Sequence, residues 1–205
     1  GICDMPTPDP IKRGAHKAID EDQSIYSHYG GIIELRQALL KKAVEYNHIP
    51  VTSTDEIMVT VGSTGAFVTA MFTLLNPGDE VIVFEPYYGY HCNLLTVMGA
   101  NQKFVRTSGP DWNIDFDAVE ALITPRTKAI IVNTPGNPSG KVWSRAELNR
   151  IALILEKHDL FAITDEIYEY MLYDDREHIS LASIPGAFER TITLSGFSKT
   201  YNMTG

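Results

Sequence analysis

The sequence predicts an α/β domain with a mostly parallel central sheet and helices on both of its faces. Short, continuously apolar runs alternate with amphipathic runs along the chain, and turn-forming residues separate them. Continuously apolar strands are typical of parallel sheets, because helices cover both faces. The chain has 205 residues, of which 44% are hydrophobic and 21% are charged, and this suffices for one sizeable core.

Six short apolar runs are the predicted strands. They are residues 57–60, 81–84, 103–105, 129–133, 161–164 and 191–194. Turn signals punctuate the series at Asn76-Pro77-Gly78-Asp79 and Thr134-Pro135-Gly136-Asn137-Pro138.

Four amphipathic runs between these strands are the predicted helices. They are residues 33–46, 65–75, 116–123 and 145–157. The last follows Ser144, and Glu147 comes three residues later, which is the signature of a capping box. No internal repeat or linker marks a domain boundary within this series.

Composition excludes several classes of protein. The net charge is −9, so a nucleic acid would be repelled on average. The longest apolar stretch, residues 66–75, is far shorter than the ~20 residues that a bilayer requires, so no membrane span is expected. The two cysteines, Cys3 and Cys92, and the six histidines have no metal-ligand spacing. We therefore predict no metal site and a reducing compartment, the cytoplasm.

Lys199 is a candidate for covalent chemistry. It closes the run Leu194-Ser195-Gly196-Phe197-Ser198-Lys199, directly after a predicted strand. A lysine becomes a nucleophile toward carbonyl groups when burial or positive charge depresses the pKa of its ammonium group. Taken alone, a surface lysine at a strand end is the simpler interpretation, and the surrounding motifs decide between the two.

Further candidates follow the first two predicted strands, at the end of the sheet where ligands collect in folds of this kind. The run Gly62-Ser63-Thr64-Gly65 opens a helix, and its backbone N–H groups suit a phosphate. It is not a Walker loop, and a plain strand-to-helix turn explains it about as well. The run Glu85-Pro86-Tyr87-Tyr88 supplies aromatic rings that either stack on a planar ligand or pack in the core.

Polar side chains also follow the fourth and fifth predicted strands. The loop of residues 133–140 packs prolines and glycines around Asn137, and such rigidity can aim its amide at one acceptor. Asp165 stands where an apolar run ends, and a buried carboxylate needs a cation or well-made hydrogen bonds. A helix N-cap is the alternative interpretation of Asp165. Tyr168 lies on the same face as Asp165 if a helical turn begins at Asp165.

Together these motifs resemble the large domain of the class I and II pyridoxal-phosphate aminotransferases, of fold type I, over residues 26–205. Residues 1–25 then form an N-terminal segment that leads into this domain. Six motifs occur in the family's order: Tyr26 with Gly31 and Glu34-Leu35-Arg36, Gly62-Ser63-Thr64, Glu85-Pro86-Tyr87-Tyr88, Asn133 to Gly140, Asp165 with Tyr168, and Ser198-Lys199 with Met203-Thr204-Gly205.

The resemblance implies roles for the residues around the cofactor ring. Lys199 would hold pyridoxal 5′-phosphate as an internal aldimine and then act as general base and acid between Cα and C4′. Asp165 would pair with the pyridine nitrogen and keep the ring protonated, as an electron sink for the substrate. Asn137 and Tyr168 would hydrogen-bond the phenolate oxygen, and Tyr88 would stack on the ring.

The resemblance also implies a phosphate site. Ser63 and Thr64 would hold the phosphate through side chains and backbone, in the turn that starts at Gly62. Ser195 and Ser198 are further candidate ligands beside the lysine. Many relatives have a serine where this chain has Gly196, so one ligand is missing here. The same glycine excludes the Ser-x-x-Lys nucleophile of acyl-transfer enzymes.

Two more expectations come from the resemblance. The tyrosine that matches Tyr26 reaches the phosphate of the neighbouring subunit, so a homodimer is expected. A cis peptide bond is expected before Pro138.

The sheet is expected to be incomplete in this chain. In the family, the next strand runs antiparallel inside the sheet, and the small domain beyond it supplies the arginine that binds the substrate α-carboxylate. Without that strand, ladder groups stay unpaired. We therefore expect these 205 residues to be a truncated portion of a longer enzyme.

Transfer of an amino group between an amino acid and a 2-oxo acid is the expected activity. An α,β-eliminating or cyclising lyase of the same fold, which also uses pyridoxal phosphate, shares nearly every motif and is the first alternative. A non-catalytic aminotransferase-like module is the second. The presence of Lys199, Asp165, Asn137 and Tyr168 together argues against a module without chemistry.

Overall fold

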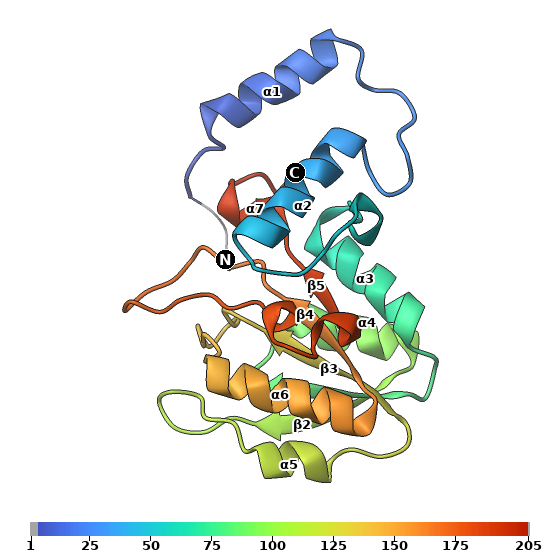
Figure 1. Cartoon of the computed structure of the whole chain (residues 1–205), viewed down its shortest axis with the longest axis vertical. Coiled ribbons are helices and arrows are strands. Elements are labelled where there is room, and N and C mark those ends of the chain that lie inside the picture. Colours follow the sequence, from blue (N-terminus) through green and yellow to red (C-terminus); the bar gives the residue numbers. More distant parts are fainter. Residues whose placement is uncertain (1–3, 205) are drawn as a thin grey trace.

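A five-stranded parallel sheet forms the centre of the computed structural model, which describes residues 4–204 (Figure 1). Its strands lie in the order β2-β1-β3-β4-β5, and all four neighbouring pairs are parallel. The strands are β1 (Glu80–Glu85), β2 (Asn101–Arg106), β3 (Thr127–Asn133), β4 (Phe161–Asp165) and β5 (Thr191–Leu194). Their carboxyl ends therefore share one edge of the sheet. Cys3 and Gly205, named above, lie outside the described residues.

Helices cover both faces of this sheet, as predicted. The helices are α1 (Asp9–Asp20), α2 (Ile33–Glu45), α3 (Gly62–Leu74), α4 (Gly89–Met98), α5 (Phe116–Ala121), α6 (Arg145–His158) and α7 (Phe197–Thr200), with short 3₁₀ turns η1 (Thr54–Glu56), η2 (Leu181–Ser183) and η3 (Phe188–Arg190). Buried side chains of α3 and α4 pack in one core, and those of α5, α6 and η2 pack in a second core. The sheet separates the two cores.

Successive side chains of β1 alternate between the two cores. Ile82 packs in the core that includes α6, whereas Val81 and Val83 pack in the core that includes α3. All three side chains are at most 1% exposed. Burying an aliphatic side chain of this size stabilises the fold by about 1.5–3 kcal/mol. The continuously apolar sequence of the strand thus follows from burial on both faces.

Five of the six predicted strands are confirmed, and the strand predicted at residues 57–60 is wrong. Ile57 has extended backbone angles, φ −116° and ψ 126°, but this run pairs with no strand among the described residues. The N–H of Val59 donates instead to the carbonyl oxygen of Gly30, at 2.9 Å. An apolar extended run becomes a strand only when a second strand completes its ladder.

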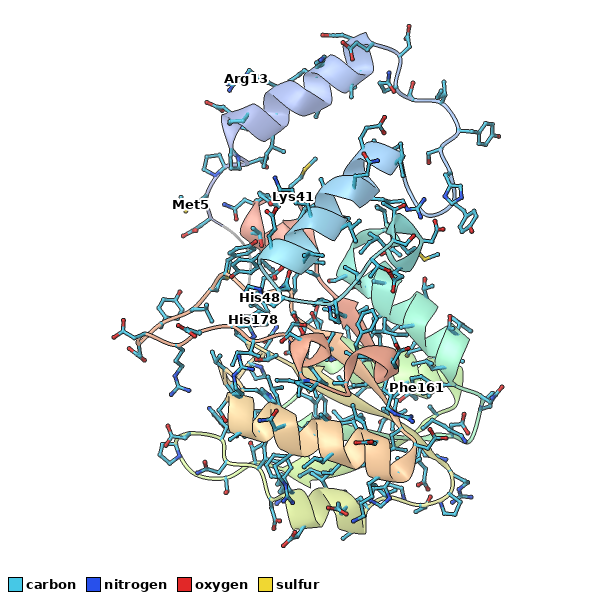
Figure 2. All side chains as sticks on the ribbon, in the orientation of Figure 1. Met5, Arg13, Lys41, His48, Phe161 and His178 are labelled. Carbon is cyan, nitrogen blue, oxygen red and sulfur yellow. The ribbon has the colours of Figure 1, made fainter. Side chains whose placement is uncertain are left out.

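Three helices, α1, α4 and the one-turn α7, lie outside the sequence predictions, and the first two differ in burial. Helix α1 has no buried residue and lies at the far end of the molecule from the sheet, with Arg13 pointing away (Figure 2). Helix α4 is packed on the sheet and ends at Gly99, whose φ of 78° is the left-handed conformation that favours glycine. Among residues 4–204, no helix is both long and apolar enough to cross a membrane.

Candidate active site

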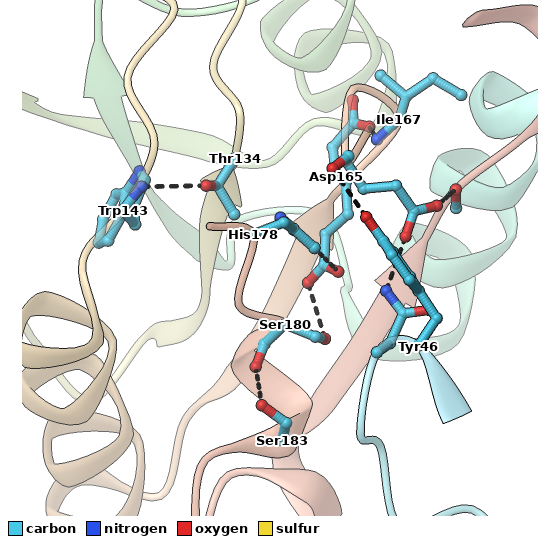
Figure 3. A network of polar contacts seen from close by, with 12 residues as sticks. Tyr46, Thr134, Trp143, Asp165, Ile167, His178, Ser180 and Ser183 are labelled. Carbon is cyan, nitrogen blue, oxygen red and sulfur yellow. Dashed lines mark hydrogen bonds and ion pairs between the residues drawn. The ribbon is translucent and has the colours of Figure 1, made fainter. Parts of the chain in front are cut away.

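Asp165 ends β4 at the shared edge, and its carboxylate is buried with only 6% of the residue exposed. Its Oδ1 atom accepts a hydrogen bond from the N–H of Ile167, at 3.2 Å (Figure 3). This bond closes an Asx turn, so the chain turns sharply after the strand. The backbone oxygen of Asp165 accepts the side-chain amide of Asn133, at 2.8 Å. The carboxylate is therefore fixed at the edge where the other candidates gather.

His91 is a site residue that sequence reasoning missed. Its Nε2 atom lies 3.0 Å from Oδ2 of Asp165, although the two residues are 74 positions apart. The imidazole is 4% exposed and packs against Phe67 and Tyr88, with ring centroids 4.6 Å and 5.4 Å away. The available signal was its position three residues after Tyr88, which puts both on neighbouring positions of one helical turn.

Asn137 and Tyr168 converge beside Asp165. The side-chain oxygen of Asn133 accepts the N–H of Asn137, at 2.7 Å, and this bond holds the loop. The Asn137 amide donates to the Tyr168 hydroxyl at the long distance of 3.5 Å. The peptide bond before Pro138 is cis, as predicted. Two hydrogen-bonding side chains, from the segments that follow β3 and β4, thus meet at one point.

Tyr88 stands at the start of α4, close to the same point. Its ring meets those of Tyr90 and His91 edge to face. Burial chiefly raises the pKa of the Tyr88 phenol, and Tyr90, Tyr168 and Asp165 add to the effect. The phenol therefore stays neutral near pH 7, and its ring offers an aromatic surface to a planar ligand.

Lys199 reaches the site from the one-turn helix α7. Its Nζ atom lies 5.7 Å from the centroid of the Tyr168 ring, within the range of a cation–π contact. The lysine is neither fully buried nor fully exposed. The structure thus gathers the amine, an amide, a phenol and a buried carboxylate at the carboxyl ends of β3, β4 and β5.

The proposed phosphate site lies where the start of α3 meets the turn before Lys199. A Cβ atom on Gly196 would stand 2.9 Å from Cδ1 of Ile167 and 3.7 Å from the backbone nitrogen of Ser63. A Cβ atom at this position would therefore require the end of the Ile167 side chain to move, whereas glycine leaves the close approach undisturbed. Helix α3 begins at Gly62, with φ 66°, and no described side chain caps it. The N–H groups of its first turn are thus suited to an anion.

Four other candidates occupy different surroundings. The Ser195 hydroxyl donates to the buried carboxylate of Glu169, at 2.7 Å, so binding a phosphate would require this bond to break. Ser198 is half-buried on α7, beside Lys199, and Thr64 is exposed. Tyr26 is fully exposed between α1 and α2, and the structure does not bring it to the other candidates within one chain.

The arrangement fits a planar aldehyde cofactor that carries a phosphate. Asp165 offers a buried negative charge, which a protonated ring nitrogen requires. The cradle at Gly196 and the first turn of α3 offer room and N–H donors to the phosphate. Lys199 offers an amine beside Tyr168. The residues present therefore fit the ring nitrogen, the aldehyde and the phosphate of pyridoxal 5′-phosphate.

Comparison with known proteins gives consistent matches along the whole chain. The sequence model of the family described as aminotransferase class I and II matches residues 2–205. The chain is 38% identical to aromatic-amino-acid aminotransferase 2 of Thermococcus litoralis, over 100% of this chain and 53% of that protein. It is 35% identical to human kynurenine–oxoglutarate transaminase 1, over 100% of this chain and 52% of that protein.

Solved structures agree with these sequence matches. An aromatic aminotransferase of Pyrococcus horikoshii superposes with a TM-score of 0.94 at 37% identity, over 98% of this chain and 54% of that one. An aspartate aminotransferase double mutant of Thermus thermophilus gives 0.95 at 37% identity, over 100% and 53%. The chain thus spans about half the length of the curated relatives it matches.

Proposed function

The chain belongs to the class I and II aminotransferases, and from that premise we propose that it carries the cofactor-binding part of an enzyme that exchanges amino groups between amino acids and 2-oxo acids. The cofactor of this family is pyridoxal 5′-phosphate, and residues 26–205 would form its binding domain. The observation that carries the proposal is the buried Asp165 carboxylate beside His91, at the same edge of the sheet as the cluster of Asn137, Tyr168 and Lys199.

Each residue of the cluster would have one task. When bound, the cofactor supplies the aldehyde that takes up the amino group and a ring that accepts the electron pair left at the substrate Cα. Asp165 would hold a proton at the ring nitrogen, and His91 would keep that carboxylate oriented. Lys199 Nζ would take the proton from the substrate Cα and deliver it to C4′, the carbon that would keep the amino group. Asn137 and Tyr168 would bind the ring's phenolic oxygen.

Tyr88 would cover one face of the ring and exclude water from it. Ser63 and Thr64, at the start of α3, would bind the phosphate, with Ser198 beside them. Ser195 remains a candidate ligand only if it leaves Glu169. These assignments place both ends of the cofactor on the edge of one sheet.

A homodimer would complete the site. The Tyr26 side chain is fully exposed and stands apart from the cluster, so it is available to a second subunit's phosphate. The enzyme would act in amino-acid metabolism in the cytoplasm.

The test uses the complete gene product mixed with pyridoxal phosphate, with Lys199→Ala beside it. We expect a visible absorbance band in the unchanged protein and none in the variant, because the proposal assigns the bond with the aldehyde to Lys199. Lys41→Ala is the control, since Lys41 carries an exposed side chain, and it should keep the band.

Amino acids are then added to the loaded protein. Conversion of the band to the pyridoxamine spectrum supports amino-group transfer. Release of ammonia together with a 2-oxo acid would instead favour a lyase. A band that survives in Lys199→Ala would contradict the proposal.

A further inference from the structure

Glu169 is a buried carboxylate outside the cluster described above, and all of its partners are polar side chains. The residue is 1% exposed. Its Oε2 atom accepts hydrogen bonds from Nζ of Lys42 and from the side-chain amide of Asn47, each at 2.7 Å. Its Oε1 atom accepts the hydroxyl of Ser195, also at 2.7 Å. A carboxylate with this many short hydrogen bonds has a fixed orientation.

The partners of Glu169 also hold one another. Lys42 donates to the side-chain oxygen of Asn47, at 2.7 Å, so the three groups form a closed ring of hydrogen bonds. The Lys42 ammonium lies over the stacked rings of Tyr46 and Tyr170, and the Tyr46 hydroxyl donates to the backbone oxygen of Glu169 (Figure 3). The cluster is therefore rigid on the side of α2.

The charge state of Glu169 favours these hydrogen bonds. Burial acts to raise the pKa of the carboxyl group, but hydrogen bonds from Lys42, Ser195 and Asn47 outweigh it and hold the pKa below its ordinary value. The carboxylate is thus ionised at neutral pH and accepts all three donors.

Ser195 connects this cluster with the lysine turn. It is the first residue after β5, and α7 with Lys199 begins two residues later. On its other side, the N–H of Glu166 donates to the carbonyl of Leu194, at 2.8 Å. The connection is therefore held by Glu166, the residue after β4, just before Ser195, and by Glu169 at Ser195. Gly196 then passes against Ser63 on its way to the lysine.

We propose that Glu169 is a positioning residue for Lys199, because it ties Ser195, in the connection that presents the lysine, to Lys42 and Asn47 at the end of α2. Through this link helix α2, which contributes no group to the cofactor cluster, sets the direction of the Lys199 amine. The inference rests on the proposed function and adds the means by which the amine is held toward the aldehyde.

The test compares two forms of the cofactor on the complete gene product. Pyridoxal phosphate binding depends on the bond to Lys199, whereas pyridoxamine phosphate lacks the aldehyde and depends only on the remaining contacts. We expect Glu169→Gln and Ser195→Ala to weaken pyridoxal phosphate binding by about tenfold, as for one lost hydrogen bond to a charged group. Pyridoxamine phosphate binding should change by less than about threefold.

Glu80→Gln is the matched control. Glu80 is also 1% exposed and also binds a lysine, but it lies at the start of β1, at the opposite end of the sheet. It should leave the ratio of the two affinities unchanged, even where it lowers stability. Ser195→Ala removes a single hydroxyl and keeps the test valid if Glu169→Gln fails to fold.

The double variant gives a second check. Glu169→Gln with Ser195→Ala should weaken pyridoxal phosphate binding no more than either change alone, because both break the same link. Equal losses for the two cofactor forms would overturn the inference, since they would indicate general damage to the site. Unchanged affinity for both would also overturn it. If the unchanged protein forms no lysine-dependent band, the proposed function itself fails.

Discussion

Two buried carboxylates at opposite ends of the sheet, Glu80 and Asp165, are held in different ways. Glu80 begins β1, and its Oε1 atom lies 3.3 Å from both Lys103 and Arg126. Its Oε2 atom accepts the hydroxyl of Thr124, at 2.7 Å. Hydrogen bonds from Thr124 and the two cations lower the pKa of Glu80. The protein itself thus supplies full charge compensation at this end.

Asp165 lies at the carboxyl end of the sheet with a weaker set of partners. It meets the imidazole of His91 and the N–H of Ile167. The difference teaches that a buried carboxylate with several cationic partners joins segments of the fold. One with a histidine and a backbone amide as partners has fewer cationic partners and is open to a positively charged group of a ligand. The predictions below test whether the two carboxylates differ in this way.

The largest expected effect comes from replacing each of these two carboxylates with the corresponding amide. In the complete gene product, Asp165→Asn should lower amino-transfer turnover by about 10³-fold, as when one partner of a buried charge pair worth ~4 kcal/mol is removed. Glu80→Gln should instead lower the unfolding midpoint in urea and keep the turnover of the folded enzyme. Equal losses of turnover in both variants would break the comparison.

A smaller effect is expected from the partner of Asp165. His91→Phe keeps the ring packing against Phe67 and Tyr88 but loses the contact with the carboxylate. Turnover should fall by about tenfold, since a hydrogen bond to a charged group contributes ~1.5–3 kcal/mol. The control is His158→Phe, because His158 pairs with Glu120 away from the site. A wild-type rate in His91→Phe would remove His91 from the proposed site.

The smallest expected effect concerns a third buried carboxylate, Glu169. It lies near the site, but like Glu80 it accepts several hydrogen bonds, and they hold its pKa below the ordinary value. A lowered pKa stabilises the fold at pH values above the unfolded pKa of about 4.3, and this contribution disappears as the pH falls through the folded pKa.

This pH dependence of stability can be measured directly. The free energy of unfolding in urea is compared between the unchanged protein and Glu169→Gln from pH 7 down to pH 3. Their difference should be largest near pH 7 and shrink below about pH 4.3. A difference that grows as the pH falls would show that the folded state does not hold Glu169 ionised.

Local patterns in the sequence predicted those elements whose determinants lie close together in the chain. The capping box of Ser144 and Glu147 forms as predicted at the start of α6. Strand β5 has the predicted bounds, Thr191–Leu194. Helix α3 begins at Gly62, three residues before the predicted start, because its first turn has no capping side chain to mark it.

The apolar runs, the caps and the order of the motifs were thus determined by the sequence alone, because each depends on neighbours within a few residues. Only the tertiary structure decided which distant groups meet. It brought His91 to Asp165 and Glu169 to Ser195, and within residues 4–204 it left residues 57–60 without a strand partner. The physical reason is that hydrogen-bond partners and strand ladders are selected by packing across the whole sheet, which no local period encodes.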